Sequence, residues 1–217
     1  MSNQDPEPDL VSLERAIFRR TLNHGLFDIA IGCAFSMFAL GPYASAWGLG
    51  DFWASAVFVP FWGLVASILW FVHRRLVVPR LGHVTFARRR KKRLVTWNMI
   101  SVGVGVLAFV VGLISCSAFG LIPPIVHAVA VGLAVFAGFA LAGYYLELRR
   151  LYLYGVVICA APLTGELLWK YGGVPHHGFP VTFGFAAALC LFVGVGLLVR
   201  FTSRHPLPPR EADSGGA

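Results

Sequence analysis

PIVHAVAVGLAVFAGFALAGYYL, residues 124–146, contains no Asp, Glu, Lys or Arg. A helix rises about 1.5 Å per residue, so a segment of this length crosses the roughly 30 Å hydrocarbon core of a bilayer. Five further apolar stretches lie at approximately 24–40, 52–72, 98–119, 151–169 and 181–201. The sequence therefore predicts an all-α, polytopic membrane protein with six transmembrane helices.

The composition of the whole chain agrees with this class. Of its 217 residues, 57% are hydrophobic and 13% are charged, whereas a soluble domain is about half apolar and about a quarter charged. Strands of an outer-membrane barrel are about ten residues long and alternate in polarity. The stretch from Val102 to Ser115 lacks that alternation, so a helical protein is expected.

Lysine and arginine are distributed unevenly about the predicted helices. Of the 18 basic residues, only Lys170 lies in the loops on one side of the membrane. The others precede the first helix, separate the second from the third or the fourth from the fifth, or follow the sixth. Loops rich in Lys and Arg usually face the cytoplasm. We therefore expect both termini and the basic loop at 73–97 to be cytoplasmic.

This threading divides the chain into three parts. Residues 1–22 are expected to form a cytoplasmic tail with an interfacial helix, whose arginines contact lipid headgroups. Residues 23–201 form the six-helix transmembrane domain. Residues 202–217 form a disordered cytoplasmic tail. Pro60 and Pro162 lie inside predicted helices and are expected to kink them.

A short pattern recurs at an offset of 130 residues. The Arg-Arg pair at 19–20 recurs at 149–150, and Gly25 recurs as Gly155. A duplication would make the first two predicted helices a parallel repeat of the last two. Chance, combined with a shared need for arginine at the inner membrane face, explains the same pattern, and both readings stay open.

Small residues recur every four positions on two predicted helices. They are Ala108, Gly112, Cys116 and Gly120 on the third, and Ala130, Ala134, Gly138 and Ala142 on the fourth. Such stripes let helix backbones approach closely in lipid. A tight hairpin of these two helices is the first interpretation, and a contact between copies of the chain is the second.

Asp28 is the main ionisable candidate within a predicted span, and His24 precedes it by four residues on the same helical face. Ionisable groups at membrane depth are functional-site candidates because they are expensive to leave unpaired. This pair could relay protons or bind a cation. Alternatively, Asp28 is an interface carboxylate neutralised by His24 or by an arginine of a neighbouring helix. Two other acids have ordinary helical ion-pair spacings, Glu147 with Arg150 and Glu166 with Lys170.

Three histidines fall near the opposite membrane face. His127 begins the helix at 124–146, and His176 and His177 lie in a loop not far from Glu166. Imidazoles of this kind could bind a cofactor or pigment. Adjacent histidines project in different directions, so the spacing does not demand a ligand, and no metal site is assigned.

The most basic segment of the chain is a run of six residues: Arg88, Arg89, Arg90, Lys91, Lys92 and Arg93. A run of this kind suits anionic lipid headgroups, at about 1 kcal/mol per basic residue near the surface. An acidic cytoplasmic partner is the alternative, and nucleic acid is not the expected partner.

The residues before this run, Pro79-Arg80-Leu81-Gly82-His83-Val84, resemble the cytoplasmic Pro-Arg-x-Gly-aromatic-Val loop of uncharacterised prokaryotic multi-helix membrane proteins. His83 stands where that family has an aromatic residue. The resemblance implies a multi-pass protein of the prokaryotic plasma (inner) membrane. It implies no activity and no cofactor.

The sequence contains no recognisable enzyme signature, such as Gly-x-Ser-x-Gly, His-Glu-x-x-His or a phosphate-binding glycine loop. The first hypothesis is therefore a non-catalytic scaffold or accessory subunit that binds other membrane subunits or forms a homo-oligomer. The alternatives are a small-solute or ion transporter and a cofactor- or pigment-binding subunit.

Overall fold

The computed structural model describes residues 23–46, 48, 57–81, 95–100, 103 and 123–206, and the regular structure within them is entirely helical. Five helical segments are long and apolar enough to cross a membrane: Leu26–Tyr43, Phe58–Arg80, Ile125–Leu146, Arg150–Gly172 and His176–Arg204. The prediction of an all-α membrane protein is thereby confirmed.

Several predicted features lie outside the described residues. They are the interfacial helix before residue 23, the basic run at 88–93, most of the predicted span at 98–119 and the tail after residue 206. Residues 95–100, which lead into that span, are helical.

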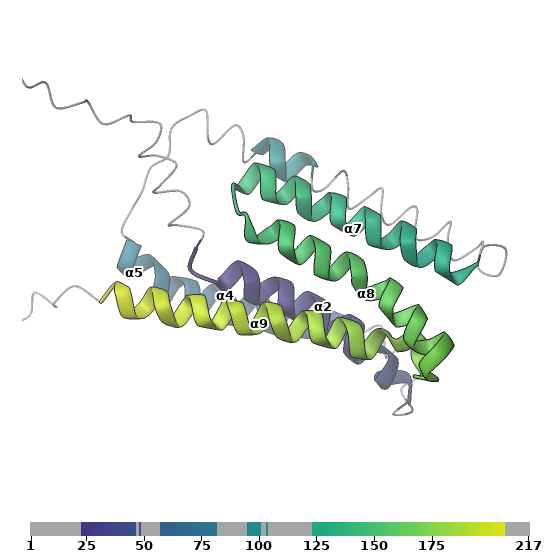
Figure 1. Cartoon of the computed structure of the whole chain (residues 1–217). Coiled ribbons are helices and arrows are strands. Elements are labelled where there is room, and N and C mark those ends of the chain that lie inside the picture. The colour runs from purple at the N-terminus through teal and green to yellow at the C-terminus, as the bar shows by residue number, and fades with distance from the viewer. Residues whose placement is uncertain are drawn as a thin grey trace, which may run out of the picture.

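The helices form two groups joined by a central helix (Figure 1). α2 (Leu26–Ala46) and α9 (Phe179–Arg204) lie side by side, and α7 (Pro124–Leu146) lies on the other side of the bundle. α8 (Arg150–Gly172) begins beside the end of α7 and crosses obliquely to α9, so that it contacts both groups.

A close crossing of α2 and α9 depends on glycine. Gly25 has a φ of +82°, and a Cβ added to it would lie 2.1 Å from the carbonyl oxygen of Gly194. A Cβ on Gly194 would in turn lie 2.8 Å from the backbone nitrogen of Ile29. Glycine is required here both by the backbone conformation and by the approach of the two helices.

The core lies between α2, α8 and α9. Leu151 and Ile158 of α8 and Ala186 of α9 are at most 1% exposed. Farther along the bundle, the Phe35 and Phe183 rings stack with centroids 6.0 Å apart. These aromatic side chains fill the space between the helices with apolar atoms.

α4 (Phe58–Val72) continues beyond its predicted end. It passes through a π-helical turn, η1 (His73–Val77), into α5 (Val78–Leu81), so the first part of the segment expected to be a basic loop is helical. Val77 is 1% exposed and packs in one cluster with side chains of α2 and α9. Arg80 donates a hydrogen bond from Nε to the His205 carbonyl oxygen at 2.9 Å. These contacts favour helix over an extended chain.

Of the two prolines expected inside helices, one lies where it was predicted and one does not. Pro162 does lie inside α8. Pro60 lies in the first turn of α4 as the structure describes it, where a helix tolerates proline without a kink. α2 extends past its predicted end at residue 40 to Ala46 and includes Pro42.

α7 contacts α8 through glycines that do not belong to the predicted stripe. A Cβ on Gly132 would lie 2.7 Å from the Cys159 carbonyl oxygen, and one on Gly143 would lie 2.8 Å from the Tyr152 ring. Close packing of α7 against α8 therefore uses a face other than the predicted stripe, which was assigned to the contact with the preceding span.

Most of the predicted small-residue stripe of α7 lies on the side away from α8, but Ala142 is buried in the core cluster that contains Leu151 and Tyr154 of α8. Ala130 and Ala134 are exposed, and a Cβ on Gly138 would have nothing within 4 Å. Seven residues beyond Gly138, and hence on the same helical face, the Tyr145 ring stacks on Trp97 with centroids 5.6 Å apart. Trp97 leads into the third predicted span, so this contact favours a hairpin within one chain.

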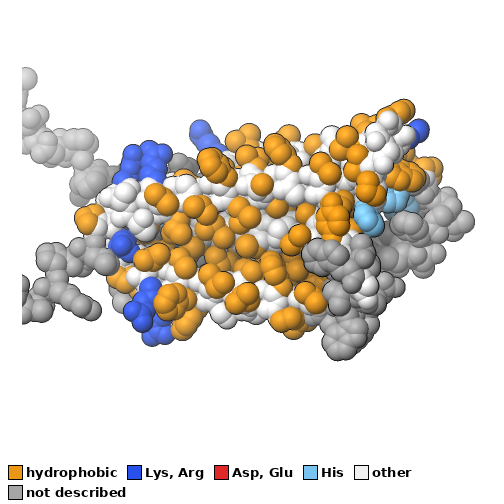
Figure 2. All heavy atoms as spheres, turned by 90° about the horizontal axis from the view of Figure 1, so that it is seen from below, with side chains coloured by type: hydrophobic (Ala, Val, Ile, Leu, Met, Phe, Trp, Pro, Cys, Tyr) orange, Lys and Arg blue, Asp and Glu red, His pale blue; other side chains and the backbone are white. Residues whose placement is uncertain are grey.

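Basic side chains gather at one end of the molecule. Figure 2 shows most Lys and Arg side chains of the visible face at that end, His side chains at the opposite end, and hydrophobic side chains between them. The ends of α4–α5 and α9 meet there through the Arg80–His205 contact. We call the end with Arg74, Arg75, Arg80, Arg200 and Arg204 the basic end.

Candidate functional site

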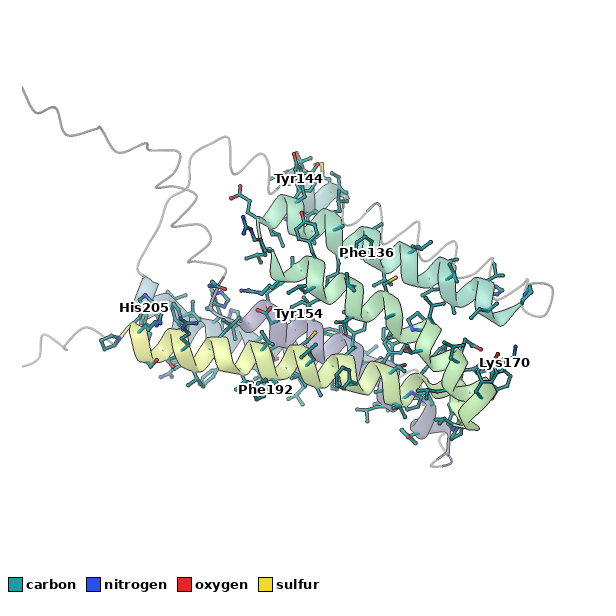
Figure 3. The ribbon with its side chains drawn as sticks, in the orientation of Figure 1. Phe136, Tyr144, Tyr154, Lys170, Phe192 and His205 are labelled. Carbon is teal, nitrogen blue, oxygen red and sulfur yellow. The ribbon has the colours of Figure 1, made fainter. Side chains whose placement is uncertain are left out.

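A buried carboxylate joins α2 to α8 near the basic end. Asp28 lies in the first turn of α2, and none of its surface is exposed. Its Oδ1 lies 2.7 Å from Nε of Arg150 and accepts a hydrogen bond from the Tyr154 hydroxyl at 2.8 Å. Both partners come from α8, where a spacing of four residues places them on one face. Tyr154 is labelled on this helix in Figure 3.

Arg150 supplies the compensating charge for Asp28. An unpaired carboxylate in hydrocarbon is expensive, and charge-assisted hydrogen bonds are stronger than neutral ones. The guanidinium also donates from a terminal nitrogen to Oδ1 of Asn23, just before α2. Of the interpretations that the sequence left open, the geometry corresponds to neutralisation by an arginine of a neighbouring helix.

His24 lies beside this cluster and contributes no counter-charge. Its Nδ1 accepts a hydrogen bond from the backbone N–H of Leu26 at 3.2 Å, and its ring centroid lies 5.8 Å from that of His73. Burial, together with the nearby His73 and Arg150, lowers the pKa of His24 to about 4. The imidazole is therefore neutral at pH 7.

The second oxygen of the carboxylate is incompletely satisfied. Oδ2 of Asp28 is buried and has no hydrogen-bond partner in the described part of the chain. Buried polar atoms usually have a partner, so this oxygen is an open acceptor for a proton, a water molecule or an ion. Oδ2 of Asp28 is therefore the one atom of this cluster that supports the predicted ion or proton site at His24 and Asp28.

Beyond Asp28, the described core becomes apolar toward the opposite end. The next buried side chains along α8 are Ile158, Ala161 and Pro162, before the buried Glu166 at the far end. Phe183 of α9 belongs to the same core cluster as Ile158 and Ala161. The Phe35 ring covers Phe183. The polar cluster therefore lies near the basic end and meets an apolar layer on its other side.

A second polar contact lies at the opposite end. Nδ1 of His177 lies 2.9 Å from Oε1 of Glu166, and the His177 ring packs on Trp169 with centroids 4.4 Å apart. The spacing of Glu166 predicted an ion pair with Lys170, but the Lys170 ammonium lies instead over the Tyr171 ring at 5.5 Å. The helix-to-helix turn, which periodicity does not describe, brings His177 to Glu166.

The three histidines proposed to hold a cofactor have separate surroundings. His176 has its ring 6.2 Å from that of Tyr43, whereas His177 packs on α8. His127 is at the start of α7, and Figure 1 shows α7 and α8 diverging toward this end. In the searched, described residues, no group of three or more His, Cys, Asp or Glu side chains could hold a metal ion.

The sequence predicted an arginine of a neighbouring helix as one possible partner of Asp28, but it identified neither Arg150 nor Tyr154. Arg150 was paired with Glu147 by spacing, but α7 ends at Leu146, Glu147 has a φ of +57°, and α8 begins at Arg150. The chain therefore leaves the helix between those two residues. The available signal was the four-residue spacing of Arg150 and Tyr154 at the start of a span.

No family model, curated protein or solved structure matches this chain.

Proposed function

We propose that this protein is a non-catalytic integral membrane scaffold or accessory subunit of a larger membrane assembly. The observation that carries this proposal is the buried contact of Asp28 with Arg150 and Tyr154. Through this contact, the charged group at membrane depth holds α2 against α8. Polar contacts of this kind stabilise helix association in lipid.

The apolar layer supports a structural role over transport. A transporter needs a substrate site that is reached from both sides in turn, commonly near the bilayer midplane. Here the Asp28 cluster lies near the basic end and the Glu166–His177 contact lies at the opposite end. Ile158, Phe183 and Phe35 occupy the core between these two polar contacts. The positive-inside rule further supports a plasma-membrane protein whose basic end faces the cytoplasm.

Exposed apolar side chains of α4 support a partner within the membrane. They lie around most of the helix: Val59, Leu64 and Ile68 are 76%, 60% and 52% exposed, whereas Val65 is 9% exposed against the bundle. The exposed side chains offer a contact surface to another membrane helix. A second copy of this chain or a different subunit would satisfy the proposal equally.

Purification in mild detergent tests the proposal. We expect partner subunits or a homo-oligomer to co-purify and to be identified by mass spectrometry. A photo-crosslinking residue at Ile68 should give a discrete protein adduct, whereas the same residue at Val65 serves as the matched control facing the bundle. A monodisperse monomer with only lipid adducts at Ile68 would contradict a scaffold role.

A second candidate, a proton or small-ion transporter, is favoured by one observation, the open Oδ2 of Asp28. Reconstituted protein would then move protons or cations across vesicle membranes, and Asp28→Asn would abolish the flux. Cys190→Ala, which alters another buried side chain of the core, is the control. If the wild-type protein transports none of the tested cations and small anions across the vesicle membrane, this candidate is ruled out.

A further inference from the structure

Two arginines at the end of α4 lie over aromatic rings. The Arg74 guanidinium carbon is 5.3 Å from the centroid of a Trp70 ring, and that of Arg75 is 5.4 Å from the Phe71 centroid. Each arginine follows its ring by four residues, so the two pairs lie side by side on one turn. Contact with a ring face orients a guanidinium and reduces the freedom lost on binding.

These side chains face the surroundings of the bundle. Trp70 and Phe71 are 60% and 56% exposed, and Arg74 and Arg75 are exposed as well. Within the described residues, the ion pairs join Arg150 to Asp28 and His177 to Glu166. The charges of Arg74 and Arg75 are therefore not compensated by a carboxylate of that part of the chain.

The backbone that carries the two arginines is held firmly. They lie in the π-helical turn His73–Val77, where Val77 is buried in the cluster with Leu26 and Phe201. One turn later, Arg80 donates hydrogen bonds to the carbonyl oxygens of Leu76 and His205. Arg80 is thus used within the fold, whereas Arg74 and Arg75 project from a fixed turn.

We propose that Trp70, Phe71, Arg74 and Arg75 form a binding site for an anionic phospholipid in the leaflet at the basic end. The aromatic rings lie on the apolar side of the arginines, as the acyl chains of a lipid do relative to its phosphate. Guanidinium groups bind phosphate oxygens with charge-assisted hydrogen bonds. This inference does not depend on the scaffold proposal, because lipid binding needs no protein partner.

Native mass spectrometry of the detergent-solubilised full chain tests the site with phosphatidylglycerol and with phosphatidylcholine. We expect wild type to retain phosphatidylglycerol preferentially. A charge-assisted hydrogen bond from a guanidinium to a phosphate oxygen is worth about 1.5 kcal/mol, which is about tenfold in affinity. Arg74→Gln/Arg75→Gln should therefore weaken phosphatidylglycerol binding by about 100-fold, with little change for phosphatidylcholine.

The matched control is Arg200→Gln/Arg204→Gln. It removes the same charge from exposed positions of α9 at the same end, and the basic run at 88–93 is present in every variant. We expect the control to retain phosphatidylglycerol within about twofold of wild type. Equal losses in the two double variants would show a general charge effect and overturn the site. Inorganic phosphate that binds the detergent-solubilised protein as tightly as the lipid would overturn the assignment to a lipid.

A second measurement needs only one conservative variant. Brominated phosphatidylglycerol should quench the Trp70 component of the fluorescence, obtained as wild type minus Trp70→Phe, more strongly than brominated phosphatidylcholine does. The other five of the six tryptophans cancel in this difference. Equal quenching by the two lipids would overturn the proposal even if the arginine variant failed to fold.

Discussion

Replacement of Arg150 by Gln removes the charge that compensates Asp28. The carboxylate is fully buried, and the Arg150 side chain is 16% exposed. Breaking a buried pair from one side costs about 3–5 kcal/mol. Because Arg150 is partly exposed and the Tyr154 hydroxyl still donates to Asp28, we expect the lower value, a loss of about 3 kcal/mol in the free energy of unfolding.

A double-mutant cycle separates this pair from other effects of Arg150. Unfolding of wild type, Arg150→Gln, Asp28→Asn and the double variant would be followed in mild detergent by circular dichroism. Once Asp28 is neutral, loss of Arg150 leaves no bare charge, so the double variant should be more stable than the sum of the single losses predicts, by at least about 1 kcal/mol. Additive losses, or an Arg150→Gln variant as stable as wild type, would refute the role given to this contact.

Three further predictions concern neighbouring positions. Tyr154→Phe removes one hydrogen bond to Asp28 and should cost about 1 kcal/mol by the same unfolding assay. Gly25→Ala should lower the free energy of unfolding by about 3 kcal/mol. The φ of Gly25 is +82°, and the new Cβ would clash with the backbone of the opposing helix, so backbone strain adds to overpacking. Gly196→Ala serves as the control and should be neutral, because a Cβ there would have nothing within 4 Å. The pKa of His24 is about 4 in the folded protein and about 6.5 in the unfolded protein. As the pH falls, the unfolded state therefore binds the proton first. The free energy of unfolding should accordingly decrease as the pH drops from about 6.5 to 4. A pH titration of thermal unfolding should show a smaller fall for His24→Gln, and equal falls would contradict the burial of this imidazole.

The helices themselves could be predicted because the signal is local. Length and apolar composition decide whether a segment can cross a bilayer, and segments such as 124–146 and 151–169 correspond closely to α7 and α8. The helical continuation of α4 into Leu81 was missed. It depends on packing of Val77 against α2 and α9, which a pattern of proline, glycine and arginine in the sequence does not reveal.

The site was predicted only in part. Asp28 and His24 stand out in the sequence as polar residues near or within an apolar segment. The hydrogen-bond partner of Asp28, Tyr154, is 126 positions away in the chain, and its identity follows from how α8 crosses the bundle. Helical spacing likewise assigned Glu166 to Lys170, because it takes no account of the turn that brings His177 to Glu166.

The contact between Asp28 and Arg150 also constrains the order in which the protein matures. Translation delivers α2 to the membrane long before α8 is synthesised, and during that interval the carboxylate lacks the cation that neutralises it in the finished fold. Such a segment is costly to leave in lipid. We therefore expect α2 to settle at its final depth after the arrival of α8 completes the pair.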